Sequence, residues 1–444
     1  MTLPESFIAE LETVLGKEDT QKYLSLFEKN PYRGISINRL KTTPEKLLPL
    51  LPFSAEGSPF YRDGYYIPSD ADGVGNNALH HAGAFYVQEP SASSAVSLLE
   101  IEPGEYVLDL CAAPGGKSSQ IASMLNNTGL IWSNEVVRNR AGVLLSNFER
   151  MGISHGVVSS CRPEVLCQRL EGCFDKVLAD APCSGEGMFR KDNDAVTQWS
   201  REHVIACANR QISILQSAAR CVREGGILVY STCTFSPEEN EETAEKFLEL
   251  CPDFEPYDIT ELSGRKTRLS NAVRITPVEG GEGHFAVRFR RKGSSQRAGR
   301  VNCSKANNKE EEKLAGSFLE DIFRKRPDMV LGIRNGKIYL LPHDMPPVEG
   351  LGVIRAGVLA GEFVKKRIEP AHALFSSFRP DHFRRVLDLS LDDIRLDDYL
   401  RGLEIDCDGE PGYTCVSVEG ISLGFGKCSG GRLKNKYPKG LRKV

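Results

Sequence analysis

Short apolar segments alternate with helical stretches over residues 83–290, and this alternation constrains the fold more than any other feature of the sequence. The apolar segments are YVLDL from 106, GLIWSNE from 129, HGVVSS from 155, FDKVLAD from 174 and GGILVYST from 225. The helical stretches between them are Lys117–Leu125, Arg138–Met151 and Glu202–Val222. Strands that are apolar throughout and separated by helices are typical of a parallel sheet covered on both faces. The pattern predicts an α/β fold with a doubly wound, mostly parallel sheet, to which RITPVEGGEGHFAVRFR adds an antiparallel hairpin.

The rest of the chain indicates further domains around this sheet. A chain of 444 residues has room for roughly two to four domains. Residues 1–75 predict a small N-terminal α+β lobe, in which an amphipathic helix, Pro4–Leu15, precedes a short strand. The sheet domain is expected to span 76–292, and the polar, charge-rich stretch 293–312 to be a linker. Residues 313–375 and 376–444 are expected to form two C-terminal modules.

Composition and charge narrow the classes of function. Lys and Arg total 56 against 60 Asp and Glu, a net charge of -4, so any polyanion must bind to local basic patches rather than to the whole surface. No run of about 18 apolar residues is present and the N-terminus lacks a signal-peptide layout, so we expect a cytoplasmic protein that contacts no membrane. The 13 cysteines show no C-x-x-C pair, which argues against a disulfide scaffold and against a metal site.

A Gly-rich turn follows the first strand of the predicted sheet and precedes a helix, in YVLDLCAAPGGKSSQIASML. Gly115 and Gly116 let a ligand approach the backbone, and the free amides at the start of the helix favour a polar or anionic group. The G-x-G-x-x-G pattern of dinucleotide sites is absent, which favours a smaller adenosine compound. Glu135, at the end of the next strand, is placed to accept hydrogen bonds from ribose hydroxyls. These features predict S-adenosylmethionine (SAM) as the cofactor.

Two cysteines follow neighbouring strands of the predicted sheet, Cys183 in DAPCSGEG and Cys233 in YSTCTFSPEEN. Together with Asp180 they lie at the carboxyl ends of parallel strands, where open α/β sheets bind ligands. Both are in polar loops, in which a thiol can be reached by a substrate and its reactivity adjusted. Most of the other cysteines are expected to be buried small apolar residues.

A SAM-dependent enzyme needs such a thiol if it methylates carbon 5 of cytosine, because that carbon is too weak a nucleophile to attack a sulfonium methyl group. Addition of a thiolate to carbon 6, helped by a carboxyl group at ring nitrogen 3, turns the ring into an enamine whose carbon 5 can attack. Release then needs a base that removes the carbon 5 proton, and a second cysteine can serve. Asp180 would supply the carboxyl group at ring nitrogen 3, and for this role it is expected to be partly buried with a raised pKa.

The ordered motifs CAAPGGK at 111–117, DAPCSGEG at 180–187 and STCTFSPEEN at 231–240 resemble the Sun family of SAM-dependent RNA cytosine-5 methyltransferases, and most of all its bacterial RsmF type, which acts on 16S rRNA. The resemblance covers about 80–290 and includes YVQEPSASSA at 86–95. It implies that Cys233 is the nucleophile, that Cys183 assists product release, and that the base is contacted by Asp180 and Lys117. It also implies that SAM is held by Cys111, Ala112, Ala113, Pro114, Gly115, Gly116, Lys117, Glu135 and Asp180.

The chain departs from the family pattern after the third strand of the sheet. Many members place an acid there to bind the adenine amino group, but VVSSCRPEVL has no acid before Glu164. Cys161 or Arg162 occupies the corresponding position. We therefore expect backbone atoms to hold adenine, and we assign it no side chain.

Two basic segments predict contacts with RNA. Arg190 and Lys191 directly follow the DAPCSGEGMF loop and are expected to touch phosphates beside a flipped base. The terminal segment GRLKNKYPKGLRKV carries Arg432, Lys434, Lys436 and Lys439 beside Tyr437, and no acid occurs from Lys427 to the end. This segment resembles the PUA-like RNA-binding module of RsmF-type enzymes, and it is basic where the chain as a whole is acidic.

The sequence thus predicts an enzyme that methylates carbon 5 of cytosine in RNA, with 16S rRNA or the small ribosomal subunit as its partner and no protein partner required. Three alternatives stay open. The same reaction could act on tRNA or 23S rRNA; the substrate could be DNA, which would make Cys183 the attacking residue; or the chain could be an RNA-binding ribosome assembly factor that no longer methylates. The last is disfavoured because Lys117, Asp180 and both cysteines are present.

Overall fold

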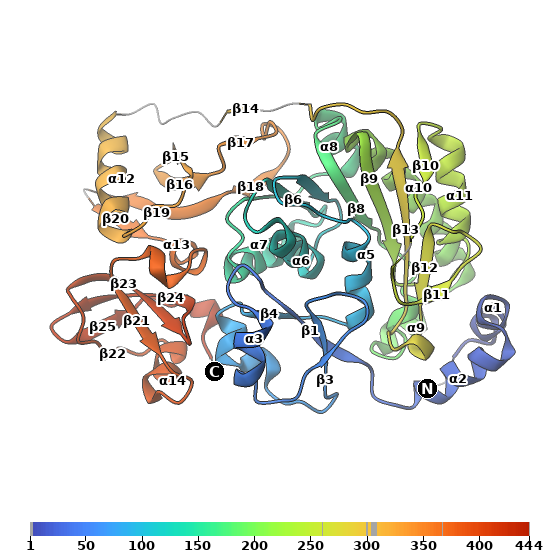
Figure 1. Ribbon diagram of the computed structural model, residues 1–444, viewed down its shortest axis with the longest axis horizontal. Coiled ribbons are helices and arrows are strands. Elements are labelled where there is room, and N and C mark those ends of the chain that lie inside the picture. Colours follow the sequence, from blue (N-terminus) through green and yellow to red (C-terminus); the bar gives the residue numbers. More distant parts are fainter. Residues whose placement is uncertain (1–2, 260, 299–300, 303–308, 366, 444) are drawn as a thin grey trace.

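The computed structural model describes residues 3–259, 261–298, 301–302, 309–365 and 367–443. Figure 1 shows a central sheet with the N-terminal strands on one side of it and two C-terminal sheets beside both. Among the described residues, no helix combines the length and the apolar character needed to cross a membrane.

The central sheet has ten strands in the order β11-β12-β13-β9-β8-β5-β6-β7-β18, with β10 paired to β13. Its parallel strands are β5 (Tyr106–Asp109), β6 (Leu130–Asn134), β7 (Gly156–Ser159), β8 (Phe174–Asp180) and β9 (Val222–Thr232). Its antiparallel strands are β10 (Phe254–Pro256), β11 (Arg265–Lys266), β12 (Ala272–Ile275), β13 (His284–Arg291) and β18 (Val353–Ala356). The five predicted apolar segments are the five parallel strands, and the predicted hairpin is β12 with β13. The prediction of a doubly wound, mostly parallel α/β sheet is confirmed.

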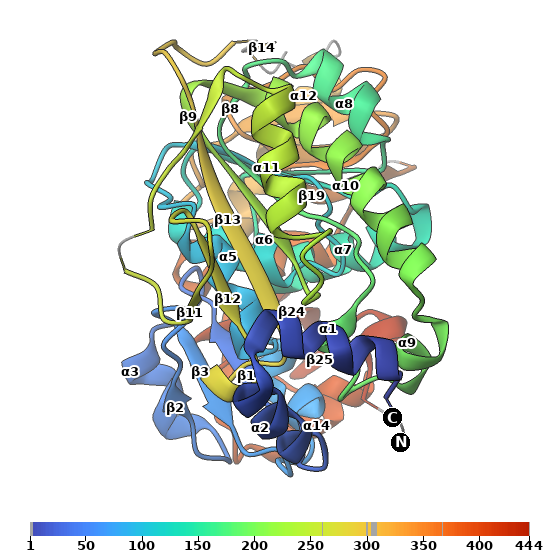
Figure 2. The same ribbon diagram turned by 90° about the vertical axis from the view of Figure 1, so that its right-hand side faces the viewer.

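The parallel strands are apolar throughout because both faces of the sheet are covered. Along β5, Leu108 packs into the core on one face and Val107 into the core on the other. The first core includes side chains of α8 (Pro163–Arg169), α10 (Arg201–Cys221) and α11 (Glu241–Leu250), and the second includes those of α5 (Ser94–Ser97), α6 (Gly116–Leu125) and α7 (Arg138–Met151). Figure 2 shows α10 and α11 on one side of the strands and α5 on the other. The turns after the parallel strands therefore meet at one edge of the sheet.

The N-terminal region consists of a small sheet and a separate pair of helices. The sheet has the order β2-β3-β1-β4 and contains β1 (Arg33–Ile37), β2 (Glu56–Gly57), β3 (Gly64–Ile67) and β4 (Phe85–Val87), with α3 (Pro44–Leu47) and α4 (Ala78–His81) beside it. Its last strand lies beyond residue 75. Helices α1 (Glu5–Leu15) and α2 (Lys17–Phe27) lie apart from these strands (Figure 1).

Helices α1 and α2 pack on the loops that carry the two cysteines. The ring centroids of Phe7 and Phe189 are 4.8 Å apart, and those of Tyr23 and Phe235 are 5.7 Å apart. Phe189 follows the Cys183 loop and Phe235 lies two positions after Cys233. All four rings are buried, so the helix pair supports the cysteine loops from behind.

The C-terminal region contains two further sheets. The first has the order β15-β16-β19-β20 and contains β15 (Val330–Arg334), β16 (Lys337–Leu341), β19 (Val358–Val364) and β20 (Arg367–Pro370), with α12 (Lys309–Ile322) and α13 (His372–Ser376) packed on it. The second has the order β21-β23-β24-β25-β22 and contains β21 (Val386–Leu389), β22 (Ile405–Asp406), β23 (Gly412–Val418), β24 (Ile421–Ser429) and β25 (Arg432–Asn435), with α14 (Ile394–Arg401). Two short strands, β14 (Val301–Asn302) and β17 (Asp344–Met345), pair with each other.

Strand β18 joins the C-terminal region to the central sheet. It pairs antiparallel with β7, with Val353 opposite Ser159, and the amide of Gly357 donates to the carbonyl of Gly156 at 2.8 Å. Of the predicted linker 293–312, residues 299–300 and 303–308 lie outside the described residues, while Arg297 pairs with Asp175 at 2.5 Å. Backbone hydrogen bonds, and not only the linker, therefore connect the C-terminal region to the central sheet.

Candidate active site

The structure brings the two loop cysteines together at the carboxyl edge of the central sheet. Cys183 follows β8 and Cys233 follows β9, and their Sγ atoms are 3.2 Å apart. Both thiols are free and half-buried. The amide of Cys233 donates to the Cys183 sulfur at 3.4 Å. The hydrogen bond with Cys233, followed by burial, raises the pKa of the Cys183 thiol well above its ordinary value. Cys183 is therefore a neutral thiol that faces the sulfur of Cys233.

A buried carboxylate joins the two cysteine loops. Glu186, which belongs to the Cys183 loop, accepts hydrogen bonds from the amides of Phe235 and Ser236 at 2.8 and 3.0 Å. Its other oxygen accepts from the indole of Trp199 at 2.8 Å. Because these donors lie on the segment after Cys233, Glu186 fixes the distance between the loops. The sequence motifs contain Glu186, but nothing in its spacing indicated this role.

A second buried carboxylate, Glu239, forms hydrogen bonds with the Cys183 loop. It accepts hydrogen bonds from the amide of Ser184 at 3.0 Å and from Nε2 of Gln211 at 2.7 Å. Burial raises the pKa of Glu239 to about 7, although both hydrogen bonds act in the opposite direction. Glu239 is thus partly protonated near neutral pH.

This raised pKa predicts that Glu239 makes stability depend on pH. The folded state holds the proton up to about pH 7, whereas an unfolded chain releases it near pH 4.5, so the folded state loses stability as the pH rises through this window. The shift corresponds to about 3 kcal/mol. We expect the thermal midpoint of Glu239→Gln to fall less between pH 5 and pH 8 than that of the unsubstituted protein or of Glu242→Gln, whose side chain is exposed. Equal pH slopes in all three would show that Glu239 is ionised throughout.

An ion pair lies beside the cysteines. Nζ of Lys117 is 2.8 Å from Oδ2 of Asp180, and the hydroxyl of Ser231 donates to Oδ1 at 2.7 Å. Nε2 of His284 lies 3.8 Å from the same Oδ1. Burial alone would raise the pKa of Asp180, but Lys117, His284 and the hydrogen bonds hold this pKa below its ordinary value. The expectation of a raised pKa for Asp180 was wrong, because Lys117 points at the carboxylate.

The Gly-rich turn from Cys111 to Lys117 connects β5 to α6 at the same edge. Gly115 has φ 117°, in the left-handed region that favours glycine. A Cβ on Gly116 would lie 3.2 Å from the side chain of Gln88, so the turn packs closely there. Two of its carbonyls are bound from α7: that of Ala113 accepts from Arg140 at 3.0 Å, and that of Pro114 from Asn147 at 2.9 Å. Ala112 is buried. The turn is therefore held in one conformation with the start of α6 behind it.

Two carboxylates lie at the carboxyl ends of β5 and β6, the strands before and after this turn. Glu135, directly after β6, is buried; its side chain accepts from the amide of Val137 at 2.9 Å and pairs with Arg140 at 3.2 Å. Asp109, the last residue of β5, accepts from the hydroxyl of Ser118 at 2.7 Å and its Oδ1 has no partner. Burial raises the pKa of Asp109 to about 7. Asp109 was missed in the sequence, although its position at the end of a strand before a Gly-rich turn was a usable signal.

This set of groups fits SAM. The cofactor offers an ammonium group and ribose hydroxyls as donors, which match the unpartnered oxygen of Asp109 and the carboxylate of Glu135. After β7, where the sequence has no acid, the amide of Cys161 donates to Asn134 at 3.1 Å and Arg162 is exposed. Asp109 and Glu135 therefore offer acceptors where SAM has donors.

The two residues predicted to contact RNA beside the Cys183 loop, Arg190 and Lys191, differ in their exposure to solvent. Arg190 is buried: its side chain is 2% exposed and pairs with Glu282, also 2% exposed, at 2.9 Å. It also donates to the carbonyls of Lys29 and Asn30, both at 3.1 Å. The guanidinium thus ties the loop to the N-terminal segment, so the expectation of a phosphate contact at Arg190 is corrected. Lys191 is exposed.

The C-terminal basic segment also needs one correction. Lys434, Lys436 and Lys439 are exposed, and Arg432 pairs with Asp406 at 2.6 Å. Tyr437, which the sequence placed on the basic surface, is only 2% exposed. Its hydroxyl is 3.1 Å from Nδ1 of His81. Tyr437 therefore packs the C-terminal sheet on the N-terminal region and offers no ring to a base.

The fold and the site define a Rossmann-like methyltransferase that uses SAM. Family models match consecutive parts of the chain: the N-terminal domain of 16S rRNA methyltransferase RsmF at 3–90, 16S rRNA methyltransferase RsmB/F at 96–290, the RsmF rRNA methyltransferase first C-terminal domain at 317–378, and the methyltransferase RsmF PUA domain at 386–443. Ribosomal RNA small subunit methyltransferase F of Vibrio atlanticus is 31% identical over 467 residues, covering 99% of this chain and 97% of that protein. The protein of the same name from Vibrio campbellii is 31% identical over 472 residues, with the same coverage.

Solved structures agree with this assignment. A methyltransferase homolog protein from Pyrococcus horikoshii is 27% identical with a TM-score of 0.58, and the match covers 65% of this chain and 95% of that chain. NSun6 from the same organism, solved with SFG, is 20% identical with a TM-score of 0.58, covering 66% of this chain and 99% of that one, and shares the fold. The chain belongs to the RsmF family of 16S rRNA methyltransferases.

Proposed function

We propose that this protein transfers a methyl group from SAM to carbon 5 of cytosine in 16S rRNA through a covalent bond between Cys233 and carbon 6. The observation that carries the proposal is the pair of free thiols 3.2 Å apart, next to the ion pair of Lys117 and Asp180. A methyltransferase that acts on a nitrogen or an oxygen needs no thiol, because those atoms already carry a lone pair. Two thiols at the carboxyl edge of the sheet are what methylation at carbon 5 requires.

In the first step, the Cys233 sulfur adds to carbon 6 of the cytosine. The S–H bond of Cys233 breaks, the electron pair of the C5–C6 double bond moves through carbon 4 to ring nitrogen 3, and nitrogen 3 takes up the proton that the thiol releases, so the ring becomes an enamine. Burial alone would lower the pKa of Lys117, but Asp180 raises it, so Lys117 is an ammonium ion that stabilises the negative charge forming on the ring. Asp180 is a carboxylate and can accept a hydrogen bond from the exocyclic amine of cytosine, which uracil lacks.

The Gly115–Lys117 turn, Asp109 and Glu135 would hold the cofactor, and bound SAM supplies an electrophilic methyl group. After transfer, carbon 5 carries both a methyl group and a proton, and Cys183 removes the proton. The Cys183 pKa is raised chiefly by its hydrogen bond with Cys233, and this cause disappears once the Cys233 sulfur is bonded to carbon 6. Cys183 can then ionise and accept the proton, so the electron pair of the C5–H bond restores the C5–C6 double bond and Cys233 leaves as a thiolate, which takes back the proton of ring nitrogen 3.

The experiment that tests the proposed reaction and substrate is bisulfite sequencing of total RNA from cells with and without this protein. We expect one or more cytosines of 16S rRNA to resist deamination only when the protein is present. In cells that produce the Cys233→Ala variant instead of the unsubstituted protein, the same cytosines should be deaminated. Protection confined to tRNA or 23S rRNA would support the proposed reaction but show that its substrate is not 16S rRNA. Identical patterns in both cells would favour an assembly factor that does not methylate.

We further propose that RNA is held by the exposed lysines of the C-terminal sheet, with no membrane or protein partner required, and that the enzyme acts in the cytoplasm. The family match of residues 386–443 to a PUA domain supports RNA binding there. The division expected from the sequence, into 1–75, 76–292, a linker and two C-terminal modules, is kept as a proposal. The four family matches, which break near 90, 290 and 380, support it in outline.

Replacing Lys434, Lys436 and Lys439 by Ala should weaken RNA binding and reduce its salt dependence. For single-stranded RNA each lost phosphate contact lowers the slope of log affinity against log salt by about 0.7, so the slope should fall by about 2. Substitution is preferable to deletion of 427–444, because that segment contains β25 and the buried Tyr437. A matched variant removes three exposed lysines elsewhere, Lys17, Lys46 and Lys266. Equal slopes for the two triple variants would rule out a specific role of the C-terminal lysines.

A further inference from the structure

A cavity of about 480 Å³ lies where the N-terminal region, the central domain and both C-terminal sheets meet. Its walls come from the segment after β1, the turns before β6 and β7, the segments before β15 and after α13, and the turn between β23 and β24. Gly129 directly precedes β6 and His155 directly precedes β7, so the cavity lies at the amino edge of the parallel strands. The cysteines lie at the opposite edge. The cavity is therefore separate from the catalytic site.

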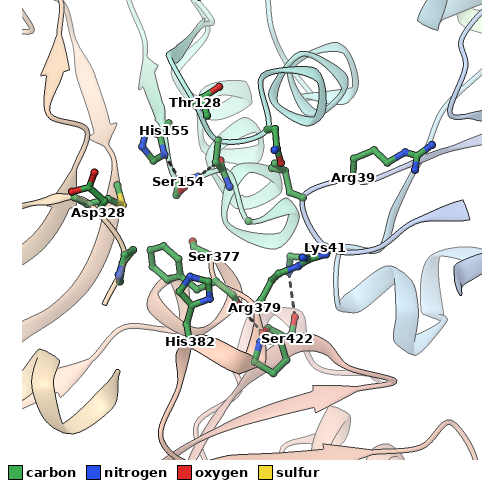
Figure 3. A pocket seen from close by; sticks show the side chains of 18 of the residues that line it. Arg39, Lys41, Thr128, Ser154, His155, Asp328, Ser377, Arg379, His382 and Ser422 are labelled. Atoms are coloured by element: carbon green, nitrogen blue, oxygen red, sulfur yellow. Dashed lines mark hydrogen bonds between the residues drawn. The ribbon is translucent and has the colours of Figure 1, made fainter. Parts of the chain in front are cut away.

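The described residues that line this cavity carry a clear excess of positive charge. Lys41, Arg39 and Arg379 contribute cationic groups, and His155, His343 and His382 contribute imidazoles, while Asp328 is the one acid among them. Figure 3 shows that Lys41, His155 and His382 come from different elements around the cavity. Arg39 is already paired with Asp63. Arg379 is exposed, and no described carboxylate forms an ion pair with it.

The ammonium group of Lys41 is held in place by two hydrogen bonds. Its Nζ donates to the carbonyl of Ala82 at 2.7 Å and to that of Ser422 at 3.2 Å, which leaves one of its three N–H groups for a ligand. No carboxylate among the described residues pairs with it. Burial, and then the charge of Arg150, lower the pKa of Lys41 to about 7. An anion in the cavity would favour the charged form of Lys41 and so offset part of this shift.

One wall of the cavity contains the half-buried ring of His382, which packs on the buried ring of Phe378. Phe378 and His382 lie with ring centroids 5.8 Å apart, tilted by 37°. An imidazole ring beside Lys41 and Arg379 suits a group that combines a planar base with a phosphate. The volume of about 480 Å³ is sufficient for such a group.

We propose that this cavity binds a nucleotide of the RNA substrate, with its phosphate between Lys41 and Arg379 and its base against His382. The chemistry recognised is a nucleotide phosphate, which could come from the RNA strand or from a free nucleotide. The RNA strand is favoured because the chain belongs to a family of rRNA methyltransferases and has a net charge of -4, so it must hold RNA at local cationic sites. This proposal rests on the RNA substrate of the proposed function.

The test compares the full-length protein with three single variants. Arg379→Glu reverses the exposed cation, Asp328→Asn removes the acid that lines the cavity, and Arg334→Glu makes the same charge change as the first at an exposed arginine outside it. Fluorescence anisotropy with a fluorescein-labelled single-stranded RNA gives the affinity of each. We expect Arg379→Glu to bind about tenfold more weakly with a salt slope smaller by about 0.7, Asp328→Asn to bind more tightly, and Arg334→Glu to be unchanged.

The two sources of the phosphate are distinguished by adding uridine monophosphate. If millimolar uridine monophosphate raises the thermal midpoint of the protein but not of Arg379→Glu, while RNA affinity is equal in all variants, the cavity binds a free nucleotide. Equal RNA affinity in Arg379→Glu and Arg334→Glu, with no effect of uridine monophosphate, would overturn the proposal. Trapping on 5-fluorocytosine RNA through Cys233 is measured in parallel. A failure of that trap with normal RNA affinities would contradict the proposed reaction and leave the cavity proposal standing.

Discussion

Cys233→Ala should abolish methyl transfer to RNA while SAM binds as before. The substitution removes the sulfur that would activate carbon 5, so we expect the rate to fall by at least about 10⁴-fold. The groups that would hold SAM lie on the turn after β5 and at the end of β6, and Cys233 forms no described hydrogen bond with Gly115, Asp109 or Glu135. Incorporation of tritiated methyl groups into 16S rRNA measures the first effect, and calorimetric titration with SAM measures the second.

Cys251→Ala is the matched control for this loss. Cys251 is also a free, half-buried thiol, but it follows α11 away from the Cys183–Cys233 pair. Its substitution should leave the rate within about twofold of normal, as surface changes away from a site usually do. Turnover by Cys233→Ala at a rate near that of Cys251→Ala would remove Cys233 from the nucleophile role. Trapping of 5-fluorocytosine RNA through Cys183 would instead give that role to Cys183, as in the DNA-type alternative.

Cys183→Ala should have the opposite phenotype and leave the protein covalently attached to its RNA. Attack by Cys233 and methyl transfer do not need the second thiol, but removal of the carbon 5 proton does, so the methylated adduct should form and persist. We expect a band of protein–RNA complex that survives denaturing electrophoresis, with turnover lowered by roughly 10²- to 10⁴-fold.

The double variant Cys183→Ala with Cys233→Ala is the control that identifies the adduct. It should form no complex, because the bond in the single variant is to the Cys233 sulfur. If Cys183→Ala turns over normally and accumulates nothing, then water or another group is the base and the assignment of Cys183 fails. Adduct in the double variant would mean that a third residue attacks the base.

Much of the catalytic half could be predicted from the sequence because local pattern and tertiary fold agree there. Strands buried on both faces are apolar without interruption, so all five were recognisable, and parallel strands must end at one edge, which placed Cys183, Cys233 and Asp180 together. The Gly-rich turn and Glu135 followed from the same geometry. These residues are close in space because they occupy equivalent positions after successive strands.

The errors concern side chains whose environment is made by distant parts of the chain. Asp180 was expected with a raised pKa because burial was considered without the ammonium that reaches it from α6. Arg190 looked like a free surface cation, and its partner Glu282 is remote in sequence. Tyr437 looked exposed among lysines, yet its ring fills the contact with His81. Spacing along the chain carries no information on such pairs, whereas it does on strand ends.

The pairing of β18 with β7 determines how the protein can be divided. A chain shortened to its first 292 residues would keep every group of the proposed catalytic site, but the edge of β7 that pairs with β18 would lose its neighbour. An unpaired strand edge can form hydrogen bonds with a strand of another chain. We therefore expect this fragment to self-associate at concentrations at which the whole protein stays monodisperse. Exchanging the RNA-binding end between relatives would likewise succeed only if residues 353–356 remain with the sheet that they complete.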